Sequence, residues 1–108
     1  MKVKNLVGKN GRAVVNQFVI KDDNRKVFQS YDSTIVKCVY NKTGCDVLIG
    51  CDWDYSRTTT KYLKIFLMNE IGLTDEEVET IKKQLRKGGN DCFIVNGRYV
   101  IYYCKDMR

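Results

Sequence analysis

The sequence predicts an α+β domain: an antiparallel β-sheet, built from an N-terminal meander and a C-terminal hairpin, with two helices on one face. Three observations support this prediction. Short β-branched and aromatic runs separated by turn signals fill residues 13–51. Apolar residues at helical spacing follow within residues 59–87. Asn96-Gly97 then separates two further apolar runs, which indicates a hairpin because a type I′ turn needs positive φ at both central residues.

Four strands are expected in the first half of the chain. The segments KDDNR and NKTG between them are turn signals, which favours an antiparallel meander. Residues 1–12 are polar, basic and glycine-containing, so we expect a flexible lead-in to a single domain that spans residues 1–108. The predicted strands are Ala13–Ile20, Lys26–Tyr31, Thr34–Tyr40 and Asp46–Cys51.

Two helices are expected next. The first begins near residue 59 with Asp54 or Ser56 as its N-cap, and it ends at Gly72. Its apolar face consists of Tyr62, Leu63, Phe66, Leu67 and Ile71. The second opens with a Thr74–Glu77 capping box and runs to about Lys87, with an apolar stripe of Val78, Ile81 and Leu85. The hairpin of Asp91–Cys104 follows it.

The charge distribution suggests an anionic partner. The chain carries a net charge of +6, and residues 1–26 hold seven basic and two acidic side chains. Such an excess fits nucleic acid or an acidic protein surface, although a basic terminus can also serve solubility alone. No apolar run is long enough for a membrane helix or a secretory signal, so we expect a cytoplasmic protein with no membrane partner.

Cysteine and histidine usage limits the possible chemistry. The five cysteines include no Cys-x-x-Cys pair, so we expect free thiols, several of them acting as small core residues. The chain contains no histidine, which excludes Ser-His-Asp and Cys-His catalysis. A zinc site is not indicated, and we expect no cofactor and no enzymatic activity.

The first predicted helix carries the candidate binding residues. Arg57, Lys61 and Lys64 fall opposite its apolar face, with Met68 among them and Ile65 beside them. This basic and apolar stripe could bind a partner surface, or it could be a solvated face. Trp53 and Tyr55 flank the helix start, where arginine and hydroxyl groups could hold an anion. The alternative there is a helix cap with an aromatic anchor. An active site, if there were one, would be sought at Asp54, Tyr55 and Arg57.

Three segments of the chain form a specific pattern: NQFVI at Asn16–Ile20, FQSYDS at Phe28–Ser33, and WDYSRTTTKYL at Trp53–Leu63, followed by Phe66-Leu67. This pattern resembles that of a family of small uncharacterised bacteriophage proteins. The resemblance covers roughly residues 13–67. It implies a phage accessory protein of the kind that binds and redirects a host component, including defence systems, and it implies no catalytic residues.

Three functions follow as hypotheses. The first is a protein-interaction module, such as an inhibitor of a host or anti-phage defence complex of the CRISPR type, located in the host cytoplasm. The second is direct nucleic-acid binding through the basic N-terminal segment and exposed tyrosines. The third is sequestration of an anionic, nucleotide-like ligand, with Arg57 and the helix start as the anion site and a concave pocket near Trp53.

Overall fold

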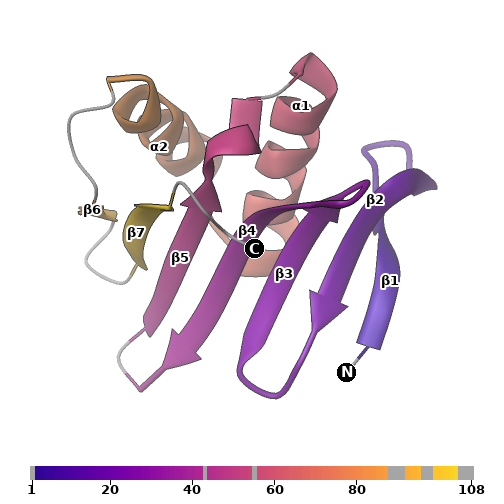
Figure 1. Ribbon diagram of the computed structural model, residues 1–108, viewed down its shortest axis with the longest axis horizontal. Helices are drawn as coiled ribbons and strands as arrows, with labels where there is room; N and C mark the ends of the chain where they lie inside the picture. The colour runs from indigo at the N-terminus through magenta and orange to yellow at the C-terminus, as the bar shows by residue number, and fades with distance from the viewer. Residues whose placement is uncertain (1, 43, 55, 88–91, 96–98, 105–108) are drawn as a thin grey trace.

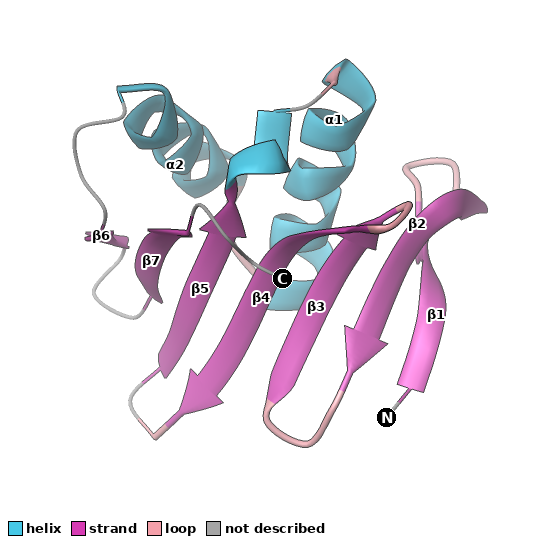
Figure 2. Cartoon of the chain, in the orientation of Figure 1, coloured by secondary structure: helices cyan, strands magenta, loops and turns pink. Residues whose placement is uncertain are grey.

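One β-sheet with helices on one of its faces forms the molecule (Figures 1 and 2). The computed structural model describes residues 2–42, 44–54, 56–87, 92–95 and 99–104. The sheet order is β1-β2-β3-β4-β5-β7-β6, which confirms the predicted α+β class. The strands are β1 Lys2–Val7, β2 Ala13–Lys21, β3 Arg25–Ser30, β4 Ser33–Asn41, β5 Gly44–Gly50, β6 Cys92–Val95 and β7 Tyr99–Cys104. The helical segments are η1 Cys51–Asp54, α1 Arg57–Phe66, η2 Leu67–Ile71 and α2 Asp75–Lys87.

The predicted meander is confirmed, and it has one strand more than expected. β2 to β5 pair antiparallel in sequence order, as the turn signals indicated. The flexible lead-in prediction is wrong for Lys2–Val7, because this segment forms β1 and pairs antiparallel with β2. Leu6 is buried in the core, and Lys2 and Lys4 on the same face of β1 are exposed, with the Lys4 ammonium reaching Glu70 of η2 at 3.3 Å. Exposed lysines on an edge strand discourage pairing with other chains. Because these lysines make the segment polar and basic, the sequence of β1 resembles that of an unstructured terminus.

The C-terminal hairpin is confirmed, but its place in the sheet departs from an all-antiparallel arrangement. β6 and β7 pair antiparallel, and the predicted Asn96-Gly97 turn lies outside the described residues. β7 lies between β6 and β5 and runs parallel to β5, with Cys45 opposite Tyr99. A parallel neighbour requires a crossover connection, and the segment from η1 to α2 provides it.

The caps of the two helices are those that the sequence indicated. Ser56 is the N-cap of α1, where its Oγ accepts from the N–H of Thr59 at 3.1 Å. The chain then continues through one π-helical segment, η2, and stops at Gly72 with φ of 93°. At α2, the N–H of Thr74 donates to Glu77 at 2.9 Å and the N–H of Glu77 donates to Thr74 Oγ1 at 3.2 Å, so the capping box is formed.

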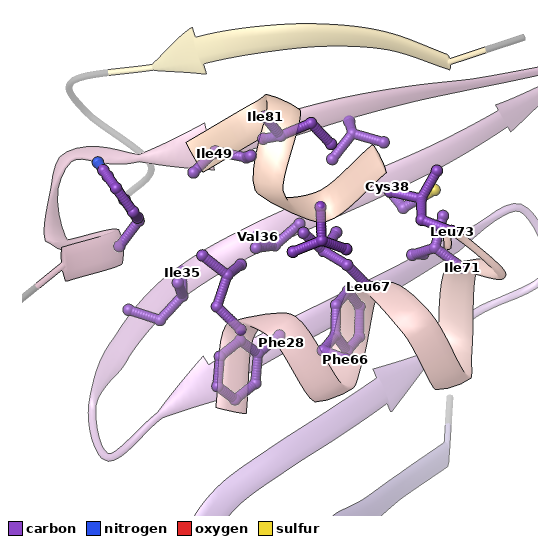
Figure 3. Close-up of a cluster of buried hydrophobic side chains, with 14 of the residues drawn as sticks. Phe28, Ile35, Val36, Cys38, Ile49, Phe66, Leu67, Ile71, Leu73 and Ile81 are labelled. Carbon is purple, nitrogen blue, oxygen red and sulfur yellow. The ribbon is translucent and has the colours of Figure 1, made fainter. Parts of the chain in front are cut away.

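The core lies between the sheet and the helices (Figure 3). The rings of Phe28 on β3 and Phe66 on α1 stack with centroids 5.6 Å apart, and both side chains are fully buried. α2 contributes the predicted stripe of Val78, Ile81 and Leu85 to the same cluster. None of the described helices is long and apolar enough to cross a membrane.

The structure corrects the expectation of free thiols at two positions. Cys38 on β4 and Cys45 on β5 form a disulfide between neighbouring strands, whereas Cys92 is free and exposed. Both members of the pair lie in the core cluster. The expectation failed because a sequence separation of seven residues says nothing about which positions the strand register brings together.

Peptide mapping without reduction checks this pairing. We expect trypsin, which cleaves after Lys37, Lys42 and Arg57, to release residues 38–42 and 43–57 as one cross-linked species, because the Cys38–Cys45 bond joins them. Fragmentation of that species then tells Cys45 from Cys51, which lies on the same peptide. Recovery of two separate peptides with alkylated thiols would contradict the disulfide.

Candidate functional site

A basic groove runs between the first turns of α1 and the second half of α2. It has a volume of about 400 Å³. Ser56, as N-cap, fixes where α1 begins and thereby directs Arg57, Lys61 and Lys64 along one side of the helix. The groove is lined by Asp54, Ser56, Arg57, Thr60, Lys61, Lys64, Lys82 and Arg86, which is five basic side chains and one acid.

Two of these lysines are neutralised by acids of α2. Lys64 pairs with Asp75 and, at 3.3 Å, with Glu79, which Lys82 also contacts at 3.4 Å. Hydrogen bonds to Asp75 and Glu79 raise the pKa of the Lys64 ammonium group. The same contacts from Lys64 lower the pKa of the Asp75 and Glu79 carboxyl groups. These pairs hold α1 against α2 and leave little charge for a partner.

Three other cations of the groove are available to a ligand. Arg57, Lys61 and Arg86 are exposed, and none of them forms an ion pair with a described carboxylate. The guanidinium of Arg86 lies 5.9 Å from the centre of the Trp53 ring, and the ammonium of Lys61 lies 5.4 Å from that of Tyr62. Such contacts with aromatic rings orient the charges without neutralising them.

The basic character continues onto the loop between β1 and β2. A second depression, of about 440 Å³, is lined by Lys9 and Arg12 of this loop together with Lys61 and Tyr62 of α1. Lys61 therefore belongs to both depressions and joins them. We call the joined region the basic surface, and it comprises Lys9, Arg12, Arg57, Lys61, Lys64, Lys82 and Arg86.

The sequence-predicted site residues divide into those that the structure brings together and those that it separates. Arg57, Lys61 and Lys64 lie together on the basic surface. Ile65 is only 5% exposed and belongs to the core, and Met68 is half-buried against the core, so the expected basic and apolar stripe has no apolar part. Trp53 is buried, as the helix-anchor alternative expects, and Tyr55 lies outside the described residues.

The burial of Ile65 has a direct structural cause. Helical periodicity places Ile65 next to the basic stripe, which reads as exposed if α1 is covered only by the sheet. α2 lies on the Lys64 side of α1, as the ion pairs of Lys64 with Asp75 and Glu79 show. The other flank of α1 faces the β1–β2 loop, where Lys61 and Tyr62 line the second depression, and Ile65 lies one turn beyond Lys61 on this flank. α1 therefore has neighbours on both flanks, and the exposed part of its surface narrows to Arg57, Lys61 and their neighbours.

Four residues of the basic surface were not predicted from the sequence: Lys9, Arg12, Lys82 and Arg86. The excess of basic residues before residue 27 was visible, but the β1 hairpin that carries Lys9 and Arg12 to α1 was not. Lys82 and Arg86 are spaced one helical turn apart, which was a usable signal for a common face of α2.

The basic surface is suited to hold anions. Guanidinium and ammonium groups stand beside the hydroxyls of Ser56 and Thr60 at the N-terminus of α1, a combination that binds phosphate or carboxylate groups. No group of three or more potential metal-ligating side chains gathers within the described part of the chain.

Comparison with known proteins identifies a family for this fold and surface. No curated protein and no solved structure shows significant similarity to the chain. A model of a family of unknown function, DUF8033, matches residues 1–86, which include β1 to β5, both helices except the last residue of α2, and all of the basic surface. The chain is a member of the DUF8033 family.

Proposed function

We propose that this protein is a non-enzymatic binding protein that attaches through its basic surface to a host or defence nucleoprotein complex and inhibits it. The observation that carries the proposal is the convergence of cations from three separate elements, the β1–β2 loop, α1 and α2, on one surface. Arg57, Lys61 and Arg86 have no carboxylate partner among the described residues, so their charge is available to a partner. The resemblance to phage accessory proteins supports the inhibitory role.

Direct binding to the nucleic-acid component is the second candidate. Its specific support is the groove between α1 and α2, whose described lining side chains are all polar or charged, since Ile65 is buried and Met68 packs on the core. Protein interfaces usually contain an exposed apolar anchor, whereas phosphate backbones are held by cations and hydroxyl groups alone. Arg57, Lys61 and Ser56 provide that combination.

Charge variants of equal net charge test the proposal. The triple variant R57Q/K61Q/R86Q removes the free cations of the basic surface, and K2Q/K42Q/K83Q removes three exposed lysines elsewhere. We expect capture of the host or defence complex to be lost in the first variant and kept in the second, because a local surface rather than total charge makes the contact. The measurement is quantitative pull-down from infected-host lysate with each variant as bait.

Labelled single- and double-stranded oligonucleotides across a salt series separate the two candidates. If nucleic acid is bound directly, the wild-type affinity falls steeply with salt, and each cation removed from the basic surface lowers the salt slope by about one. If the oligonucleotides do not bind but capture of the complex still depends on the basic surface, the contact is with an acidic protein. Equal behaviour of the two triple variants in both assays would refute the proposed function.

A further inference from the structure

A polar pocket, different from the two depressions of the basic surface, opens at the N-terminus of α1, on the sheet side of the helix. Its volume is about 610 Å³, which is the size of a small-molecule site. It is lined by residues of β2, of the β3–β4 turn and of the segment that begins α1, so three chain segments far apart in sequence meet there. Apart from Ile35 and Asp52, the described lining residues belong to the same three segments, NQFVI, FQSYDS and WDYSRTTTKYL, that carry the phage resemblance.

Gln17 gives this pocket a polar group that the protein itself does not satisfy. Its side chain is 2% exposed, and its Oε1 is buried without a hydrogen-bond partner. The side-chain amide makes no hydrogen bond with the described residues. Ser30 and Thr59, both 5% exposed, line the pocket beside it, with buried Ile35 as an apolar wall. An unpaired buried amide is costly, so its retention points to a partner from outside the chain.

The backbone around Gln17 is distorted in a way that forms the pocket. The register of β1 and β2 runs from Asn5 opposite Phe18 directly to Val7 opposite Ala13, so residues 14–17 bulge out of the β1–β2 ladder, although Gln17 still pairs with Ser30 of β3. Asn5 Nδ2 ties this bulge to the carbonyl of Val14 at 2.8 Å. Asn16 within the bulge has φ of 63° and separates exposed Val15 from buried Gln17, so the alternation of β2 is reversed there. Bulges of this kind re-aim side chains at functional sites.

The rim of the pocket holds a second unusual residue. Tyr31 has φ of 53°, a left-handed conformation that is rare for an aromatic residue, and its N–H donates to the carbonyl of Asn16 at 2.7 Å. Gln29 Nε2 donates to the carbonyl of Tyr31 at 2.7 Å. These bonds hold Tyr31 at the pocket with 62% of its surface exposed. Backbone strain maintained by surrounding bonds is typical of a binding site.

We propose that this pocket binds a nucleobase. The Gln17 amide presents an acceptor beside a donor, which matches the paired donor and acceptor groups on the edge of a base. The exposed ring of Tyr31 offers a stacking surface for a planar ligand. Asp32 and Asp52 line the pocket and no basic side chain does so among the described residues, so the uncharged part of a nucleotide fits inside better than its phosphate.

The phosphate of the same ligand has a place next to the pocket. Ser56 lines both the pocket and the basic groove, so the two sites adjoin at the N-terminus of α1. A nucleotide with its base at Gln17 therefore directs its phosphate towards Arg57 and the first turn of the helix. The base could belong to a free nucleotide or to an unpaired position in a nucleic-acid strand, and both present the same chemistry to Gln17.

Ligand-detected NMR tests the proposal with AMP, GMP, CMP and UMP as separate probes, and with ribose 5-phosphate as the base-free control. We expect saturation transfer from the protein to base protons for at least one nucleotide, and binding at least about tenfold weaker for ribose 5-phosphate. A short single-stranded oligonucleotide is the further probe. Binding by the mononucleotide indicates a free-nucleotide site, and binding only by the oligonucleotide indicates a site for an unpaired base in a strand.

Two substitutions test whether the nucleotide binds in this pocket, and neither changes a residue of the basic surface. Q17M replaces the unpaired amide by an apolar side chain of similar size, and Y31G removes the ring where positive φ favours glycine. We expect each to weaken nucleotide binding by about tenfold or more while the melting temperature of the free protein stays the same or rises. Q84M, a substitution of the same type on α2 away from the pocket, is expected to leave binding unchanged.

The results that would overturn the proposal are distinct from those for the basic surface. Absence of base-proton saturation with every nucleotide and with the oligonucleotide would refute a base site. Equal binding of ribose 5-phosphate would show a phosphate site alone. A Q17M protein that melts at a lower temperature and binds nucleotide normally would make Gln17 a structural residue. R57Q/K61Q/R86Q can lose its macromolecular partner in each of these cases, because it leaves Gln17 and Tyr31 in place.

Discussion

Replacement of Phe66 by alanine is expected to lower the free energy of unfolding by about 3–5 kcal/mol. Phe66 is fully buried, and its ring stacks on that of Phe28, so the variant loses both the buried area and the contact that joins α1 to β3 (Figure 3). Domains of this size are stabilised by only about 5–15 kcal/mol, so the loss is a large part of the total.

Urea denaturation followed by circular dichroism measures this loss as a lower midpoint at unchanged slope. Val15→Ala is the control, because Val15 is 75% exposed and its truncation is expected to change stability by less than about 0.5 kcal/mol. A Phe66→Ala protein within 1 kcal/mol of wild type, as roughly expected for a surface site, would show that the helix does not pack on the sheet as described.

Substitution of Glu70 by glutamine is expected to cost about 1–2 kcal/mol at neutral pH. Glu70 in η2 has a carboxylate that contacts Lys4 and Lys21 at 3.3 Å each and Lys26 at 3.8 Å. Its side chain is 13% exposed, whereas those of the lysines are 25–50% exposed, which limits the gain from each pair. The glutamine variant leaves three ammonium groups facing one another without an anion between them.

The difference in stability between wild type and Glu70→Gln is expected to change with pH in one direction. Burial alone would raise the pKa of Glu70, but Lys4 and Lys21 outweigh it and hold the pKa below its ordinary value of 4.5. A lowered pKa in the folded state means that the contribution is complete above the ordinary value and is lost as the pH falls through the lowered one. The stability gap between wild type and Glu70→Gln should therefore be largest near neutral pH and close on acidification below 4.5.

Urea titrations of both proteins over an acid-to-neutral pH series measure that gap. Glu76→Gln on the exposed side of α2 is the matched control, and it is expected to shift stability by less than about 0.5 kcal/mol. A gap for Glu70→Gln that is independent of pH, or one that widens in acid, would contradict the role assigned to the three lysines.

The sequence predicted the elements whose signals are local. Turns between β2 and β5, the Ser56 cap and the Thr74–Glu77 capping box each depend on a few consecutive residues, and each was found where expected. β1 was missed because its alternating lysines resemble a solvated terminus. The parallel pairing of β5 with β7 was missed because no local pattern encodes which strand edge a distant hairpin joins.

The candidate site was predicted in part for the same reason. Periodicity around one helix located Arg57, Lys61 and Lys64, because a single helix fixes their relation. It misplaced Ile65, which is buried although it lies beside the basic stripe, because its burial depends on elements outside α1. The Gln17 pocket could not be found from spacing, since a bulge reversed the inward and outward alternation of β2 at Asn16. Positions governed by long-range contacts or by irregular backbone are those that pattern analysis cannot resolve.

The parallel pairing of β5 with β7 also sets an order of events during protein synthesis. β1 to β5 are neighbours in both sequence and space, so the meander can form as soon as it leaves the ribosome. At that stage Val19, Phe28 and Val36 have no helix to cover them, and β5 is an open edge. The helices are made next, and β7 closes the edge only after they have left the ribosome. The nascent chain is therefore most vulnerable to self-association in the interval between β5 and β7.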